Sequence, residues 1–360
     1  MMKILFLSNS LGGLRCFRYE LIQFLLNRGD EIYIGANCEE SPSFFQQIGC
    51  HVIPTPMNLR GTNFFADLKL CFTYAWLLFK LKPDVVLTYT IKPNVYGGML
   101  CRLLKKKQIA SVTGLGSAFE NSGYIYKIAI ALYRCGLAKC DTILFQNQES
   151  LSVFEHLNIG VNSKKVVVAG SGVNLGKFMF YDYPLEDGNL NFLFVGKTRK
   201  EKGIDHYLEA AVKLKQRYPQ CKFHIVGACE ENYGAKLLAL QQAKIVEYHG
   251  LQYDVRPFFK MSHCCILPSY HEGMSNCLQE SSACGRPVIT TNISGCREIV
   301  DINKSGYVIP PKDTEALINA IEKFIALPYV KKAQMGIAAR SWVERYFDRN
   351  KVIKTYVDLL

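Results

Sequence analysis

Residues 267–291 read LPSYHEGMSNCLQESSACGRPVITT and have the pattern of a βαβ unit. An apolar strand runs into a polar loop that contains Gly273, a helical stretch follows, and the segment Gly-Arg-Pro at residues 285–287 leads into a second apolar strand. Strand, helix and strand in this order are typical of a parallel sheet. The loop therefore lies at the carboxyl end of a buried strand, where α/β proteins bind ligands.

The same alternation of short apolar runs and longer helical stretches continues along the chain, which indicates parallel sheets. We expect a first series of strands at Lys3–Ser8, Glu31–Ala36, His51–Pro54, Val85–Tyr89, Ile109–Thr113, Thr142–Gln146 and Val166–Ala169. A second series is expected at Phe192–Val195, Lys222–Val226, Ile245–Tyr248, Cys264–Pro268, Val288–Thr291 and Tyr307–Ile309. Among the helices, Arg15–Asn27 would bury Phe17, Leu21, Phe24 and Leu25 on one face.

A polar, proline-containing segment separates the two series. The predicted fold class is α/β, with two doubly wound Rossmann-like domains that face each other across a cleft. The N-terminal domain would span residues 1–172, a linker residues 173–190, and the C-terminal domain residues 191–340. A helix at residues 341–360 would pack back on the N-terminal domain. Two ligand-binding sheet edges suit an enzyme with two substrates.

The charge balance favours anionic partners, because the chain carries 43 basic and 31 acidic residues, a net charge of +12. Residues 60–107 hold nine basic residues against only Asp67 and Asp84, and they are also rich in aromatic and apolar residues. This combination fits an anionic membrane surface better than nucleic acid. The alternative is a core helix flanked by solvated lysines.

The 14 cysteines lack the C-x-x-C pairs and the histidine spacing that zinc sites show, which favours free thiols in a reducing cytoplasm. The histidines, among them His224 and His249, receive no assigned role. The N-terminal apolar run is too short for a secretory signal, and no stretch approaches the ~20 apolar residues of a membrane span. We expect a cytoplasmic protein, peripheral on the inner face of the cytoplasmic membrane.

Two carboxylates stand out around the loop of residues 267–291. Glu272 falls in the loop and Glu280 inside the following helix, so the pair is suited to grip two parts of one ligand. The backbone amides of residues 273–276, which are Gly273, Met274, Ser275 and Asn276, lie at the helix start and would donate to a phosphate. As an isolated spacing, two glutamates eight residues apart carry little information.

A basic loop follows the first strand of the second series. Lys197, Arg199 and Lys202 surround a strand end and suit a diphosphate, because cations neutralise the charge that develops on a leaving group. The alternative is an ordinary lysine-rich surface turn. In the first domain, Gly12 and Gly13 follow the first strand and would let the backbone approach a ligand. No G-x-G-x-x-G or P-loop pattern occurs, which argues against NAD or ATPase chemistry.

In this setting of strand, loop and helix, Glu272 and Glu280 resemble the hallmark of the retaining family-4 glycosyltransferases of the GT-B fold. The resemblance extends over essentially the whole chain. It implies that Glu272 contacts hydroxyls of the donor sugar and that Glu280 holds the ribose hydroxyls of the nucleotide. It also implies an acceptor-binding N-terminal domain, a nucleotide-sugar-binding C-terminal domain, and neither a metal nor another cofactor.

The resemblance has two departures. Family members typically carry an Arg and, five residues later, a Lys on the diphosphate, where this chain has Lys197 and Lys202. Either Lys197 fills the arginine's role or Arg199 does. Many members also have a histidine near the donor sugar, where this chain has Thr113 and Gly114. We assign these two residues to the acceptor wall, and their surroundings resemble enzymes that extend lipid-linked sugars of bacterial capsule, O-antigen or glycoprotein glycans.

The sequence therefore predicts a retaining transferase that moves a hexose or N-acetylhexosamine from a nucleotide-diphosphate sugar, UDP-linked, to a glycan hydroxyl. The expected acceptor is polyprenyl-diphosphate-linked, in bacterial surface polysaccharide or lipopolysaccharide assembly, with peripheral contact to an anionic membrane and no nucleic acid. Two alternatives stay open: a UDP-sugar 2-epimerase on the same scaffold, and a non-catalytic sugar-binding protein.

Overall fold

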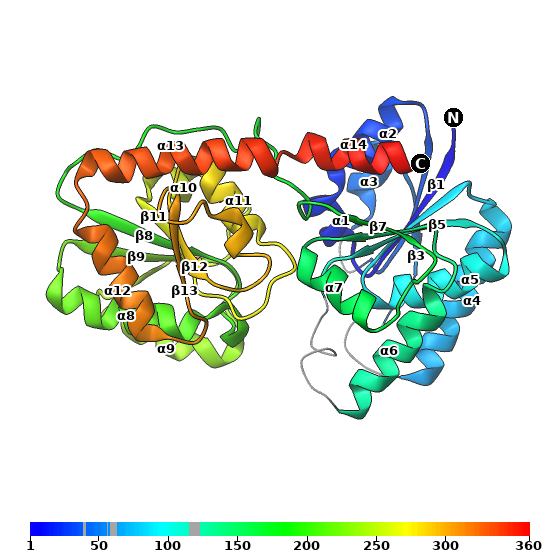
Figure 1. The fold of residues 1–360 in the computed structure, drawn as a ribbon, viewed down its shortest axis with the longest axis horizontal. Coiled ribbons are helices and arrows are strands. Elements are labelled where there is room, and N and C mark those ends of the chain that lie inside the picture. Colours follow the sequence, from blue (N-terminus) through cyan, green and yellow to red (C-terminus); the bar gives the residue numbers. More distant parts are fainter. Residues whose placement is uncertain (39–40, 56, 58–62, 115–122) are drawn as a thin grey trace. The chain divides into compact units, whose positions relative to one another are not determined.

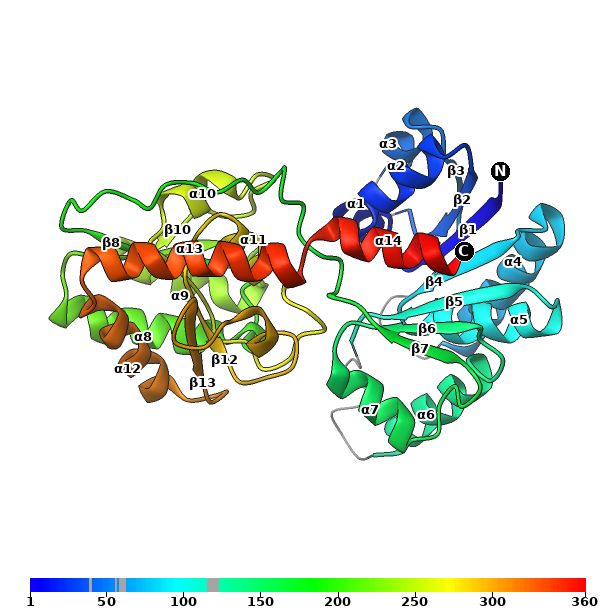
Figure 2. The same cartoon turned by 45° about the horizontal axis from the view of Figure 1, so that its top comes forward.

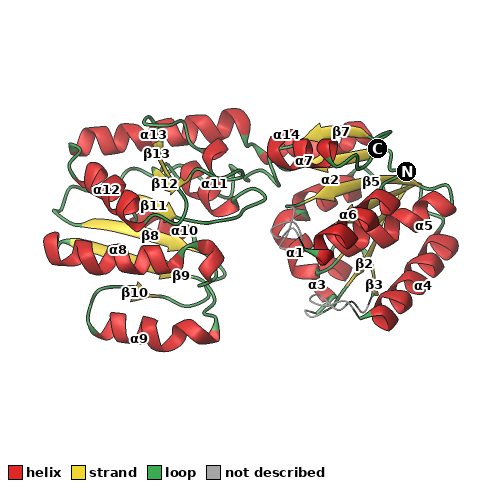
Figure 3. Ribbon diagram, turned by 60° about the horizontal axis from the view of Figure 1, so that its bottom comes forward, coloured by secondary structure: helices red, strands yellow, loops and turns green. Residues whose placement is uncertain are grey.

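The computed structural model describes residues 1–38, 41–55, 57, 63–114 and 123–360 (Figure 1). The chain forms two compact units, one of Met1–Ser171 with Ile353–Leu360 and the other of Gly172–Val352. Each unit is described by itself. In both, strands lie between helices, which gives the layered α/β architecture that the sequence predicts (Figure 3).

The first unit contains a parallel sheet in the order β3-β2-β1-β4-β5-β6-β7. Its strands are β1 (Lys3–Ser8), β2 (Glu31–Ala36), β3 (His51–Pro54), β4 (Val85–Tyr89), β5 (Lys107–Val112), β6 (Thr142–Phe145) and β7 (Lys164–Val167). Its helices are α1 (Leu11–Phe17), α2 (Tyr19–Asn27), α3 (Ser43–Gln47), α4 (Phe64–Leu81), η1 (Pro93–Gly97), α5 (Gly98–Leu103), α6 (Tyr124–Gly136) and α7 (Gln148–His156). The strand order reverses between β1 and β4, the mark of a doubly wound sheet.

The second unit repeats this plan with a parallel sheet in the order β10-β9-β8-β11-β12-β13. Its strands are β8 (Leu190–Val195), β9 (Cys221–Val226), β10 (Glu247–Tyr248), β11 (Cys264–Leu267), β12 (Val288–Thr291) and β13 (Gly306–Ile309). Its helical segments are η3 (Lys200–Lys202), α8 (Ile204–Arg217), η4 (Glu231–Tyr233), α9 (Gly234–Gln242), α10 (Arg256–Met261), α11 (Asn276–Ala283), η5 (Arg297–Ile299), α12 (Thr314–Ile325) and α13 (Tyr329–Tyr346). Here the order reverses between β8 and β11.

The last helix, α14 (Arg349–Leu359), begins in the second unit, and its residues from Ile353 onward belong to the first. Within the first unit it lies beside α1 and α2 (Figures 1 and 2). The Tyr356 hydroxyl is 2.7 Å from Ser111 Oγ, and Lys107 Nζ donates to the carbonyl of Leu360 at 2.9 Å. The end of the chain is thus hydrogen-bonded to β5.

A buried arginine organises the start of the second unit. Arg286 is fully buried and donates hydrogen bonds to the carbonyl oxygens of Tyr181, Asp182, Phe259 and Lys260 at 2.8–3.1 Å. A buried guanidinium is tolerated only when its donors are satisfied, and here carbonyls satisfy them. The arginine of the Gly-Arg-Pro segment therefore fixes the segment before β8 against α10.

Several strand boundaries differ from the sequence prediction by one or two residues, and the helix expected at residues 341–360 is instead the end of α13 followed by α14. Two further differences have a clear cause in the backbone. The helix expected at Arg15–Asn27 is interrupted at Arg18, whose φ of −133° is not helical, so α1 and α2 do not share one face. As a result Phe17 and Phe24 are exposed at 43% and 46%, while Leu21 and Leu25 are buried.

The strand expected at Ile245–Tyr248 contains only Glu247 and Tyr248. Lys244 has a φ of +55°, and the amide of Ile245 donates to the carbonyl of Leu240 at 2.9 Å. Ile245 therefore belongs to the end of α9, because a left-handed residue followed by this backward hydrogen bond is a helix C-terminal motif. None of the described helices combines the length and the apolarity needed to span a membrane.

Candidate functional site

The candidate residues of the second unit gather at the carboxyl ends of β8 and β11. These strands are neighbours in the sheet, and the strand order reverses between them. Lys197 and Lys202 follow β8, and Glu272 follows β11. In open α/β sheets, the crevice at such a reversal is where ligands bind.

The two loops are joined by their backbones. Gly203 has a φ of +71°, and a Cβ placed there would lie 1.9 Å from the carbonyl oxygen of Pro268. The amide of Tyr270 donates to the carbonyl of Glu201 at 2.8 Å. Only glycine permits this close approach at a left-handed position, so Gly203 sets the spacing of the two loops.

Glu272 is held by two donors. Lys202 Nζ and Ser269 Oγ lie 2.5 Å and 2.9 Å from Glu272 Oε1. The carboxylate side chain is only 10% exposed, so the ammonium compensates for the loss of water around it. The ion pair holds both side chains in place. The hydroxyl and phosphate groups of a ligand would replace it as partners of the two side chains.

The turn between Glu272 and α11 is tied to the loop after β12. The amide of Ser275 donates to the carbonyl of Gly295 at 2.8 Å, and Ser275 Oγ caps the helix by accepting from Leu278 N at 3.4 Å. Gly295, at φ +84°, passes so close that a Cβ would be 2.6 Å from the Gly273 carbonyl oxygen. The expectation that all four amides of this turn are exposed donors is therefore wrong for Ser275. Met274 is buried and Asn276 begins the helix.

Glu280 lies on α11 in a low-dielectric environment. Burial raises the pKa of its carboxyl to about 7, while the positive charges of Arg349 and Lys177 oppose this shift. The thiol of Cys277, one turn earlier, has a pKa raised chiefly by its contact with Cys265, with Glu280 raising it and Lys202 lowering it. The charges of Glu280 and Lys202 thus both act on the Cys277 thiol.

Of the three candidate cations in the basic loop, Lys202 and Arg199 have carboxylate partners, and Lys197 is exposed. Arg199 Nε lies 2.5 Å from Glu230 Oε1, so its guanidinium already has a carboxylate partner. The side chain of Lys197 is exposed, and over the described part of the chain it makes neither an ion pair nor a hydrogen bond. Lys197 is therefore the candidate cation of this loop that can bind an anion without first breaking an ion pair.

The remaining candidates belong to the first unit. Gly12 and Gly13 form the first turn of α1, where Gly13 N donates to Ser10 Oγ at 3.3 Å. A Cβ on Gly13 would meet nothing closer than 3.9 Å, so this glycine leaves open space. Thr113 and Gly114 directly follow β5, with Gly114 at φ +140°. Residues 115–122, which follow them, lie outside the described residues.

Sequence reasoning missed three residues of the site. Ser269 donates to Glu272, while Arg349 and Lys177 act on the charge of Glu280. Ser269 was within the quoted segment, but a serine in a loop carries no signal of its own. Arg349 and Lys177 are distant in sequence from Glu280, and only the fold brings them near it.

Comparison with known families identifies the chain. Residues 3–147 match the family described as glycosyl transferase 4-like, and residues 178–342 match glycosyl transferases group 1. The chain belongs to the glycosyltransferases that combine these two domains. It is a glycosyltransferase, as the resemblance at Glu272 and Glu280 implied.

Curated relatives span nearly the whole chain. It is 26% identical to the N,N'-diacetylbacillosaminyl-diphospho-undecaprenol alpha-1,3-N-acetylgalactosaminyltransferase of Campylobacter jejuni, over 99% of this chain and 98% of that protein. It is also 26% identical to the UDP-Gal:alpha-D-GlcNAc-diphosphoundecaprenol alpha-1,3-galactosyltransferase of Escherichia coli, over 84% and 83%.

Solved structures agree on the fold. The sucrose-phosphate synthase of Thermosynechococcus elongatus superposes with a TM-score of 0.81 at 18% identity, over 100% of this chain and 98% of that one. HepE of Anabaena in complex with UDP gives a TM-score of 0.80 at 17% identity, over 99% of each chain. The predicted GT-B fold of two doubly wound units is confirmed.

Proposed function

We propose that this chain is a retaining transferase that moves a hexose or N-acetylhexosamine from a UDP-linked sugar to a hydroxyl of a polyprenyl-diphosphate-linked glycan. The observation that carries the proposal is the Lys202–Glu272 pair at the β8–β11 reversal, with Glu280 on the adjoining helix. The names of the Campylobacter and Escherichia relatives support the lipid-linked acceptor, and the second also supports a UDP donor. The product would enter bacterial surface polysaccharide or glycan assembly.

The charges of the second unit suit the departing diphosphate. Lys202 and the exposed Lys197 neutralise the negative charge that grows on the leaving group, which is the electrostatic contribution a metal ion supplies in other transferases. Glu272 accepts hydrogen bonds from sugar hydroxyls, and Glu280 accepts them from the ribose. The transfer therefore proceeds without a metal ion in this proposal.

The transfer itself breaks the bond between the anomeric carbon and the diphosphate oxygen and forms a bond to the acceptor oxygen. The acceptor attacks from the face that the diphosphate leaves, so configuration is retained. The acceptor proton passes to a diphosphate oxygen, which is the nearest base whose basicity rises in the step. Glu272 remains paired with Lys202 or with sugar hydroxyls and is not a nucleophile of the glycosidase type.

Helix α4 supports a membrane-bound acceptor. One face packs in the core through Leu70, Tyr74, Leu77 and Leu78. The other carries an exposed apolar stripe at helical spacing: Phe65, Leu68, Phe72, Trp76 and Phe79 are 43–80% exposed. Lys80 Nζ lies 4.6 Å from the centroid of the Trp76 ring.

The buried face of α4 agrees with the core-helix interpretation, and the exposed stripe of the other face supports the membrane interpretation. The stripe suits insertion among lipid head groups, where aromatic rings and lysines sit together.

The test is the release of nucleoside diphosphate from UDP-, GDP- and ADP-sugars in EDTA, with bacterial lipid extract as acceptor. Wild type and the control Glu315→Ala, at an exposed position of α12, should release UDP only when extract is present. Glu280→Ala should not. Release from no donor would contradict the proposal, and epimerised donor without acceptor would identify an epimerase instead.

A further inference from the structure

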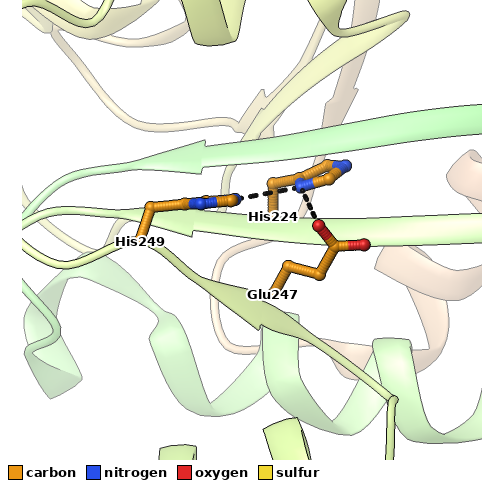
Figure 4. Close-up of side chains that lie close together, drawn as sticks. All are labelled: His224, Glu247 and His249. Carbon is orange, nitrogen blue, oxygen red and sulfur yellow. Dashed lines mark hydrogen bonds and ion pairs between the residues drawn. The ribbon is translucent and has the colours of Figure 1, made fainter.

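Three potential metal ligands meet at the free edge of the second sheet, outside the β8–β11 reversal. They are His224 on β9, Glu247 on β10 and His249 just after β10 (Figure 4). Glu247 pairs in register with His224. Glu247 and His249 are two residues apart, so they point to the same face of the sheet as His224.

The spacing of the ligand atoms fits one small cation. His224 Nδ1 is 3.1 Å from His249 Nε2 and 3.4 Å from Glu247 Oε2, and the ligand atoms of all three lie within 4.8 Å of one another. Tetrahedral zinc, with ligands at about 2.0–2.1 Å, separates its ligands by about 3.3–3.4 Å. Two of the edges of such a tetrahedron are therefore already present.

The orientation of His224 is fixed by a neighbouring amide. Asn191 Nδ2 donates to the carbonyl of Met261 at 2.9 Å, which turns Asn191 Oδ1 toward His224 Nε2 at 3.4 Å. Since Oδ1 only accepts, Nε2 carries the hydrogen, and the lone pair of Nδ1 faces Glu247 and His249. Metal-binding histidines are held in this way by an oxygen on the other ring nitrogen.

The contact between Glu247 and His224 favours a cation. The carboxylate of Glu247 faces a nitrogen lone pair rather than a hydrogen. A positive ion between the three atoms would replace this repulsion by three coordination bonds. Two imidazoles and one carboxylate favour zinc and its neighbours over magnesium or calcium, which prefer oxygen ligands.

We propose that His224, Glu247 and His249 bind one divalent transition-metal ion of the zinc class, with water completing its coordination. The site goes beyond the transferase function and takes no part in the transfer step. Its role is to fasten β10, a strand of two residues that pairs only with β9, to the rest of the sheet. The ion would stabilise the unit rather than act on the donor.

The test uses Co²⁺ and Zn²⁺ binding to the full chain after dialysis against EDTA. Cys16→Ser and Cys229→Ser form the background, because exposed thiols also bind these metals. The probe is visible absorption of bound Co²⁺, together with the thermal unfolding midpoint with and without Zn²⁺. His249→Gln and Glu247→Gln each remove one ligand.

Two further variants sharpen the result. Asn191→Ala removes only the oxygen that orients His224 and should weaken binding by roughly 10- to 100-fold. His51→Gln is the matched control, because His51 also lies on an edge strand, 3.8 Å from Glu31, but belongs to no cluster of three such ligands among the described residues.

One tightly bound equivalent with a raised unfolding midpoint is expected in the background and in His51→Gln. It should be lost in His249→Gln and Glu247→Gln. Equal binding by all of these variants, or no bound equivalent in the background, would overturn the proposal. UDP release in EDTA reports on the transferase function separately, so the two proposals fail by different measurements.

Discussion

The two units share one scaffold but differ at the point where their strand order reverses. In the second unit, the reversal between β8 and β11 carries the ion pair of Lys202 and Glu272, with Glu280 nearby. In the first unit, at the reversal between β1 and β4, the end of β4 is aromatic. Arg18 is buried there, 5.1 Å from the ring centroid of Tyr89 and 5.4 Å from that of Tyr356.

The difference fits our proposal that the two units bind different substrates. The reversal of the second unit carries the charged pair of Lys202 and Glu272, which we assign to the donor. In the first unit, the buried Arg18 lies against aromatic rings and donates to the carbonyl of Phe17 at 2.8 Å, while Tyr356 of the C-terminal helix is hydrogen-bonded to Ser111 of β5. This contrast supports our assignment of the donor to the second unit and of the acceptor to the first.

The largest effect on activity should come from removing the positive charge of Lys202. Lys202→Ala should lower kcat by about 10²- to 10³-fold, because one preorganised charge at a leaving group contributes that much. Steady-state UDP release measures it. Lys213→Ala, which breaks an exposed ion pair with Glu315, is the control and should keep the wild-type rate. A wild-type kcat in Lys202→Ala would show that this charge takes no part in the transfer.

Replacing a glycine by alanine should destabilise the second unit in the loop after β8 much more than the first unit in α1, which follows β1. Gly203→Ala meets the Pro268 carbonyl and a positive φ, so we expect a loss of about 3 kcal/mol or more in the free energy of unfolding. Gly13→Ala has open space within a helix and should change it by less than about 1 kcal/mol. Denaturant unfolding compares the two, and equal losses would contradict the assigned contact.

The α4 stripe should confer membrane binding on the first unit. Replacing Phe72, Trp76 and Phe79 together by serine should reduce co-sedimentation with anionic liposomes at low salt by more than tenfold, because three exposed apolar side chains no longer insert. The control replaces Leu185, Leu251 and Tyr253, exposed residues of the second unit, by serine. Wild-type protein that stays in the supernatant would refute membrane contact through this helix.

The smallest effect should be the pH dependence of nucleotide affinity. Burial raises the folded-state pKa of Glu280 to about 7, so the carboxylate that accepts ribose hydroxyls is lost as pH falls below that value. The Kd for UDP should therefore rise about tenfold from pH 8 to pH 6. Glu280→Gln should flatten this profile. Titration calorimetry at several pH values measures both proteins, and parallel profiles would show that another group titrates.

Much of the fold was predictable from periodicity. β1, β2, β3, β4 and β12 have the predicted bounds, because buried parallel strands are continuous apolar runs with clear ends. Ile245 was misassigned since an apolar residue in a helix C-terminal motif resembles the start of a strand. The interruption of the helix at Arg18 was not predictable, because the residue there is neither a glycine nor a proline.

The candidate site was predictable in its residue types but not in its contacts. The motif around residues 267–291 pointed to Glu272 and Glu280. Lys202 and Glu272 are 70 residues apart, and their contact depends on β8 and β11 lying side by side. Likewise, His224 and His249 lie close enough to bind one ion because β9 pairs with β10.

The most direct test of the division between the units is calorimetric titration of UDP in EDTA against two variants. Glu280→Ala, in the second unit, should weaken UDP binding by roughly 10- to 100-fold, the value of hydrogen bonds to a charged group. Thr113→Ala, in the first unit, should leave the Kd for UDP unchanged. Unchanged affinity in Glu280→Ala, with loss in Thr113→Ala, would contradict the account and place the nucleotide in the first unit.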